Sequence, residues 1–210
     1  MVSLTLELDS NLPTSYRRFT RALDAGKAVE EFSLHGSRAQ VFRFANRYRL
    51  ARAFRSVGLT GYQPPTERAY GALLRILLTC SAAEQYAKIT QSAKDLSALE
   101  KMISNEDREN CIKQITEFDA DSLFFTAVCE RTKDPRLADA VRKSLSGELR
   151  SLMPLVRSIR HAFAHGDLAP GANGARPGVA QKFAKLVCPV MMEAMDSDFS
   201  QRVNLALSTK

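Results

Sequence analysis

The sequence predicts an all-α fold, a helical bundle with additional short helices, on three observations. The chain holds 27 Ala and 24 Leu but only 11 Val and 6 Ile, and the first pair favours helix where the second favours strand. Apolar residues recur with a helical period over most of the chain. Glycine and proline together number 18 in 210 residues and concentrate between the periodic segments.

The N-terminal segment departs from this helical pattern. Residues 2–8 alternate apolar and polar side chains, a period of two that predicts one short β-strand. A lone strand needs a partner, either a second chain or a later extended segment, and a mobile arm is the alternative. Pro13 and Thr14 then begin a short helix that ends at Gly26.

Two longer helices are expected next, followed by three short ones. The first long helix runs from about Ser37 to Val57, where Gly58 ends it, and the second from Pro64 to about Gln91. The short helices are expected over 94–104, 106–117 and 120–131.

The C-terminal part is expected to contain three helices and one long loop. The loop, residues 166–178, carries four glycines and two prolines, and a loop of this length in a compact domain suggests a functional role. The helices are expected from Asp134–Pro135 to near Gly147, over about 149–165, and from about Val179 past Met195 with a kink at Pro189.

Length and composition favour one cytoplasmic domain. A chain of 210 residues is long enough to bury a full core. No segment approaches the roughly 18 apolar residues of a membrane helix, and the N-terminus lacks a signal-peptide pattern. The cysteines form no CxxC pair, so we expect reduced, partly buried thiols and neither a disulfide framework nor a zinc ribbon. They are Cys80, Cys111, Cys129 and Cys188.

Charge is distributed unevenly along the chain. The net charge is +7, which moderately favours anionic partners such as nucleic acid. Residues 34–65 contain six arginines and no acid, whereas 95–121 contain eight acids and three bases. The chain therefore has a basic segment and an acidic one.

The basic segment is a candidate nucleic-acid-binding helix. Its apolar residues Val41, Phe44, Tyr48 and Ala51 form one stripe, and its arginines spread over the remaining faces. Contacts with the phosphate backbone are one interpretation. The alternative is a solvated helix whose arginines pair with the acidic segment. The candidate contact residues are Arg43, Arg47, Arg52 and Arg55, together with Arg157 later in the chain.

The most informative segment is SIRHAFAHGD, residues 158–167, which holds two of the three histidines. On a helical wheel the apolar side chains from Leu152 to Phe163 form one buried face. His161 and His165 fall on the opposite, polar face with Arg157. One interpretation is that both histidines are exposed to solvent and that His165 stabilises the helix end before Gly166. The other interpretation is that Arg160 and an imidazole hold a phosphate group between them.

In this pattern an arginine is followed directly by a polar residue, and a His-Gly pair begins five residues after the arginine, at the end of a late helix. The pattern resembles the HEPN superfamily. Members are helical bundles, usually dimeric, and many are metal-independent endoribonucleases of toxin–antitoxin or defence systems. The resemblance implies that Arg160 and His165 are catalytic, with His161 at the polar position after the arginine. It also implies a HEPN-like bundle over about 64–200, with 1–60 as an N-terminal extension of the same domain.

The resemblance further implies RNA as substrate, bound in a groove at the seam of a homodimer. The ribose 2′-OH would attack the adjacent phosphorus without a metal or another cofactor, leaving a 2′,3′-cyclic phosphate. His165 would transfer the proton and Arg160 would stabilise the phosphoryl charge. An antitoxin or another protein is an implied partner, and a membrane is not.

Three alternatives remain open from the residues alone. A HEPN-like bundle without catalysis would serve as a protein-interaction module. A small DNA-binding regulator would use the arginine-rich helix, ideally within a helix-turn-helix. The i, i+4 spacing of His161 and His165 also suits metal binding, but no third ligand is evident in the sequence.

Overall fold

The computed structural model describes residues 11–90, 97–170 and 177–208. Within these ranges every regular element is helical, which confirms the predicted all-α class. The strand expected over residues 2–8 lies outside the described residues. The helices are α2 (Tyr16–Asp24), the 3₁₀ helix η1 (Val29–Phe32), α3 (Arg38–Ala53), α4 (Pro64–Ile89), α5 (Ser97–Glu100), α6 (Asn105–Phe118), α7 (Leu123–Arg131), α8 (Pro135–Leu145), α9 (Met153–Ala164) and α10 (Pro177–Ser208).

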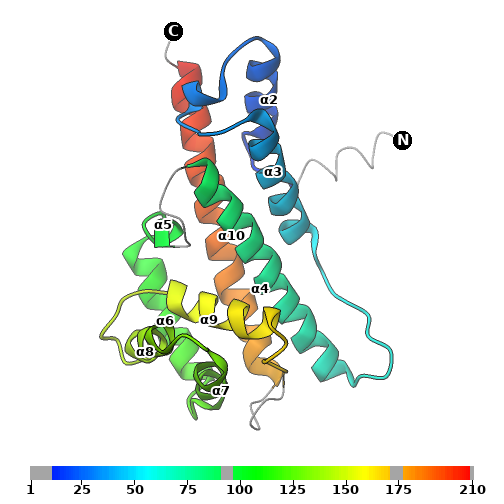
Figure 1. The fold of residues 1–210 in the computed structure, drawn as a ribbon, viewed down its shortest axis with the longest axis vertical. Helices are drawn as coiled ribbons and strands as arrows, with labels where there is room; N and C mark the ends of the chain where they lie inside the picture. Colours follow the sequence, from blue (N-terminus) through cyan, green and yellow to red (C-terminus); the bar gives the residue numbers. More distant parts are fainter. Residues whose placement is uncertain (1–10, 91–96, 171–176, 209–210) are drawn as a thin grey trace.

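Two long helices, α4 and α10, lie side by side and form the axis of the molecule (Figure 1). Helices α2 and α3 pack at one end of this pair, and α6 to α9 pack at the other. Helix α9 lies across α4 and also packs against α8. None of the described helices is both long and apolar enough to cross a membrane.

The core of the upper end is aromatic and joins the N-terminal helices to the central pair. Phe19 meets Phe32 and Phe199 edge to face, with ring centroids 4.9 and 5.5 Å apart. The apolar stripe predicted for α3 is confirmed, because Phe44 and Tyr48 are fully buried and Phe44 packs 4.6 Å from the Tyr86 ring. The described residues from Phe19 to Ala51 therefore share one core with the rest of the bundle.

Several helix ends differ from the prediction. Helix α3 ends at Ala53 and not at Val57, because Phe54 turns to an extended conformation with ψ 123°. The segment after it runs past α4, where Val57 lines a cavity beside Gly71, so tertiary packing overrides local helix propensity there. The 3₁₀ helix η1 was not expected from the sequence pattern, and α10 continues through Pro189 as one helix.

The short helices also differ from their predicted ranges, and α6 (Asn105–Phe118) extends one residue beyond each end of the predicted 106–117. Of the helix expected over 94–104, the described part is the single turn α5. Helix α7 begins at Leu123 because Ser122 adopts a left-handed conformation and the Asp119 carboxylate accepts the N–H groups of Phe124 and Phe125. The four cysteines are free and buried, in agreement with the prediction of reduced thiols.

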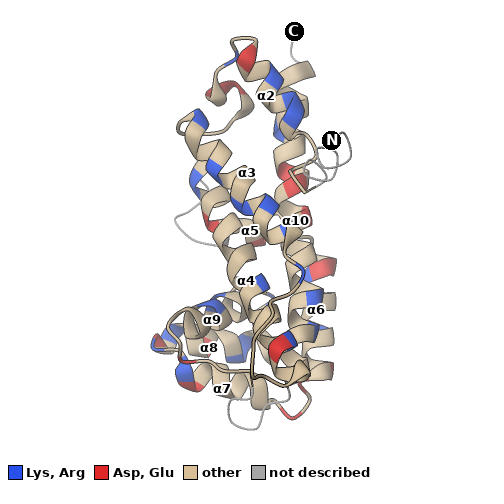
Figure 2. Ribbon diagram, turned by 90° about the vertical axis from the view of Figure 1, so that its right-hand side faces the viewer, with Lys and Arg blue, Asp and Glu red and all other residues tan. Residues whose placement is uncertain are grey.

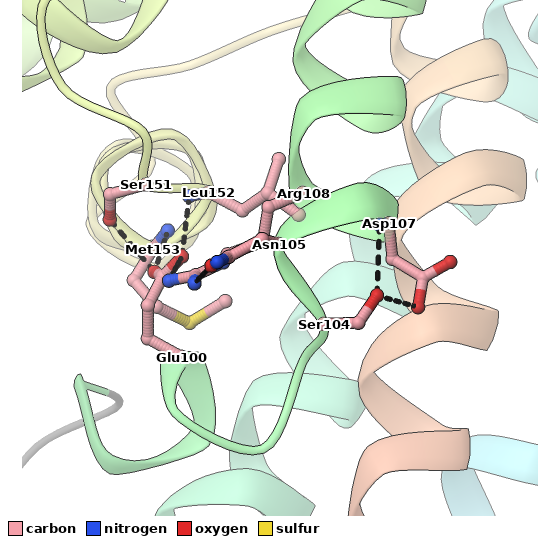
Figure 3. Close-up of polar contacts among 8 residues, drawn as sticks. All are labelled: Glu100, Ser104, Asn105, Asp107, Arg108, Ser151, Leu152 and Met153. Carbon is pink, nitrogen blue, oxygen red and sulfur yellow. Dashed lines mark hydrogen bonds and ion pairs between the residues drawn. The ribbon is translucent and has the colours of Figure 1, made fainter.

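A buried carboxylate anchors the start of α9. The Glu100 side chain accepts the backbone N–H groups of Leu152 and Met153, at 3.1 and 3.0 Å, and the Ser151 hydroxyl at 2.7 Å (Figure 3). The first N–H groups of a helix have no partner within the helix, and a carboxylate there also suits the positive end of the helix dipole. Arg108 lies 3.4 Å from Glu100 and provides the countercharge.

We expect Glu100→Ala to lower the free energy of unfolding by about 2–4 kcal/mol, because it leaves two buried N–H groups and the Arg108 charge without their acceptor. Urea denaturation followed by circular dichroism measures this loss. Glu109→Ala is the matched control, since it removes an exposed ion pair to Arg150 and should cost less than about 1 kcal/mol. Equal losses in both variants would contradict the anchoring role of Glu100.

Candidate functional site

Helix α9 presents the two faces that its sequence pattern predicts. Leu155, Val156 and Ile159 are completely buried, whereas Arg157 and His165 are exposed. Pro154 stands in the first turn, where its missing N–H costs nothing. The buried face fixes the rotation of the helix, and the polar face therefore points away from the core.

The C-terminal end of α9 closes in a Schellman motif around Gly166. The Gly166 N–H donates to the carbonyl of Phe163 at 3.0 Å, and the Asp167 N–H donates to that of Ala162 at 2.9 Å. Gly166 has φ +76°, a conformation that strongly favours glycine. His165 occupies the C-cap position. The predicted glycine stop is confirmed, and it presents His165 at the very end of the helix.

The two histidines are in contact. Their ring centroids lie 4.5 Å apart at an interplanar angle of 64°. His165 is exposed, whereas His161 is half-buried, and its Nε2 atom has no hydrogen-bond partner among the described residues. Burial lowers the pKa of His161 below its ordinary value, and the nearby charges of His165 and Arg160 lower it further. His161 therefore favours the neutral form, in which one ring nitrogen accepts a proton.

Arg160 is held by a residue that sequence reasoning missed. Its Nη2 atom lies 2.8 Å from a carboxylate oxygen of Glu84 on α4, and both side chains are partly exposed. The sequence did offer one signal for Glu84, because it is the only acidic residue between Glu67 and Asp95 and stands within a long apolar helix. A guanidinium has five N–H donors, so this ion pair leaves other donors for a ligand.

Further charges lie around the histidine pair. Lys133 lies 3.6 Å from Asp167, which follows the end of α9. The Lys133 charge acts to lower the pKa of His161, and that of Asp167 acts to raise it. Arg157, one turn before His161, is exposed on the same helix.

The arginines of α3 do not pair with the acidic segment in the described ranges. Arg38 pairs with Asp24 at 2.7 Å. Blue segments recur along α3 in Figure 2, and Arg43 and Arg47 line a shallow groove on this helix. Within the acidic segment, Glu100 and Glu109 pair with Arg108 and Arg150.

The arginines predicted to contact nucleic acid do not form one surface, because their side chains have different partners. Arg52 donates to the Tyr48 hydroxyl at 2.9 Å, and Arg55 lies beyond the end of α3 in another cavity. Arg47 reaches α4, where it donates to the Ser81 carbonyl at 3.3 Å. Ser81 precedes Glu84 by three residues, about 4.5 Å along the helix axis. Arg47 and Arg160 therefore attach to neighbouring turns of α4 from two different helices.

In the ranges that the structure describes, no three His, Cys, Asp or Glu side chains are grouped to hold a metal ion. Comparisons with protein-family models, with curated proteins and with solved structures found no match to this chain.

The lowered pKa of His161 gives a measurable pH dependence. Unfolded His161 takes up its proton near pH 6.5, whereas folded His161 does so only at lower pH, so this group reduces stability as pH falls from about 6.5 through the folded pKa. NMR titration of the ring resonances should give a pKa for His161 below the ordinary value. Lys133→Gln should raise this pKa and Asp167→Asn should lower it further; shifts in the opposite directions would contradict the assigned charges.

Proposed function

We propose that the protein is a HEPN-like, metal-independent endoribonuclease that acts as a homodimer, with its site on the polar face of α9. The observation that carries the proposal is the grouping of Arg160, His161 and His165 at one helix end. Glu84 holds the arginine, and the two imidazole rings are in contact. A cation and two proton carriers are the groups that cleavage of a phosphodiester by its own 2′-OH requires.

The environments of the two histidines suggest which one acts as the general base and which as the general acid. His161, whose pKa is lowered, takes the proton from the ribose 2′-OH as its oxygen attacks phosphorus. The bond from phosphorus to the 5′-oxygen breaks, and the exposed His165 donates a proton to that oxygen. The products are a 2′,3′-cyclic phosphate and a 5′-hydroxyl. Each proton transfer by a positioned imidazole contributes about 10²–10⁴ in rate.

Arg160 stabilises the negative charge that develops on the phosphoryl oxygens. Its ion pair with Glu84 fixes one edge of the guanidinium and directs the remaining N–H groups. Glu84 is therefore a positioning residue. Arg47, anchored one turn away on α4, extends the positive surface from the site toward the groove that Arg43 also lines.

A row of aromatic side chains supports single-stranded RNA as the substrate. Tyr62, which is 51% exposed, packs 5.5 Å from Tyr70, and Tyr70 lies 6.5 Å from Phe163 on α9. Proteins that bind single strands stack unpaired bases on such rings while cations hold the phosphates. Phe163 is two residues from both His161 and His165, which places it about 200° around the helix axis from each of them. The row therefore reaches α9 beside the site, on the face turned away from the histidines.

The alternatives lead to different expectations. An inactive bundle that serves as an interaction module would keep the dimer and bind a protein such as an antitoxin without cutting RNA. The DNA-binding alternative gains no support from α3 and α4, because the connection from Phe54 to Gln63 is far longer than the 3–4-residue turn of a helix-turn-helix. The row of aromatic side chains supports a single-stranded nucleic acid over duplex DNA as the ligand.

The direct test is cleavage of mixed single-stranded RNA by purified protein in EDTA. Arg160→Ala, His161→Ala and His165→Ala should each lower the rate at least about 100-fold. The products should carry 2′,3′-cyclic phosphate ends. Arg136→Ala, on the exposed surface of α8, is the matched control and should leave the rate unchanged.

Glu84→Gln separates positioning from charge. It should lower the rate less than Arg160→Ala does, because the guanidinium remains but loses its orientation. Cleavage that persists in all α9 variants would assign the activity to a contaminant. A wild-type protein that binds RNA but does not cut it would favour the inactive alternative, and sedimentation velocity would test the dimer separately.

A further inference from the structure

A second basic site lies between α4, α10 and the segment that follows α3. It is a cavity of about 190 Å³, and its walls come from three separate parts of the chain. Of the described residues that line it, Arg55, Arg68, Arg75 and Lys185 are cationic and Glu67 alone carries a carboxylate. Four positive charges against one negative charge leave the lining at +3.

The geometry of α4 places two of these arginines in line. Arg68 and Arg75 are seven residues apart, which brings them to within about 20° on the helix and about 10.5 Å along its axis. The buried residues Gly71 and Ala72 lie between them and form the floor of the cavity, where neither carries a bulky side chain. An anion resting on this floor would have a guanidinium on each side.

The other walls close the cavity on two further sides. The segment with Arg55, Ser56 and Val57 forms one wall, and Gln181, Ala184 and Lys185 of α10 form the other. Gln181 also donates to the Pro65 carbonyl at 3.4 Å, which ties α10 to the start of α4. Both helices begin at the same end of the molecule (Figure 1).

The cations of this cavity are not neutralised within the described part of the chain. Arg68, Arg75 and Lys185 make no ion pair there, and Glu67 makes none with any of them. Among the described residues, the Arg55 side chain donates to the Arg52 carbonyl alone, at 3.4 Å. Arg75 is partly buried, which makes an unpaired charge there costly. An anionic ligand would remove that cost.

We propose that this cavity binds the terminal phosphate of a small phosphorylated molecule, held between Arg68 and Arg75. Guanidinium groups match phosphate oxygens with paired hydrogen bonds, and a dianion suits the charge of the lining better than a single carboxylate does. The cavity is walled on three sides by separate parts of the chain, which favours a terminal phosphate over a phosphate within a continuous RNA backbone. It also lies across α4 from the Arg160 site, because Arg75 and Glu84 are nine residues apart, about 180° around the helix.

Isothermal titration calorimetry with inorganic phosphate and with a nucleoside 5′-monophosphate tests the proposal, at ionic strength matched with sodium chloride. We expect one saturable site, weakened about tenfold or more by Arg68→Gln and by Arg75→Gln. Arg68 is exposed, so its variant keeps the fold even if the Arg75 variant is impaired. Glu67→Gln should tighten binding, because it removes the one repelling carboxylate.

Arg21→Gln, an exposed arginine on α2, is the matched control and should leave the affinity unchanged. Tighter binding of the monophosphate than of phosphate would identify an organic phosphate, and equal binding would identify the free ion. Absence of saturable binding for both probes would overturn the proposal, as would affinities that are equal in wild type, Arg68→Gln and Arg75→Gln. RNA cleavage is not part of this experiment, so the two proposals succeed or fail separately.

Discussion

The placement of α9 depends on one buried carboxylate. Glu100 is only 8% exposed, and it accepts hydrogen bonds from two N–H groups at the start of α9 and from the Ser151 hydroxyl. A carboxylate in such a place is tolerated because its oxygens have partners and Arg108 supplies the opposite charge. With the start of the helix held there and its end closed at Gly166, the buried face of α9 sets which side chains reach the surface.

The candidate site is a product of tertiary structure as much as of the α9 motif. Arg160 and Glu84 are 76 positions apart in the chain and meet because α9 lies across α4. Arg47 attaches to the same part of α4 from α3. Helix α4 thus serves as a shared support, on which a guanidinium beside two histidines and a basic groove are brought to neighbouring turns.

Much of this arrangement could be predicted from residue periodicity. The spacing of Leu155, Val156 and Ile159 placed His165 on the outer face, and Gly166 predicted the helix end, because both depend on local geometry. The half-burial of His161 was not predicted. The pairings of Glu84 and Glu100 could not be predicted, since they join residues far apart in sequence. The early end of α3 was missed for the same reason: the segment with Val57 packs beside Gly71 on another helix.

The central claim is that the polar face of α9 receives RNA. The chain has three histidines, so a ring spectrum contains few signals, and His35, bonded through its backbone to Ile89, is an internal control. The most direct measurement is an NMR titration of these rings with a short RNA in which 2′-deoxy nucleotides prevent cleavage. The account predicts that the His161 and His165 signals shift on saturation while His35 stays in place. Bound RNA that leaves both α9 histidines unshifted would contradict it.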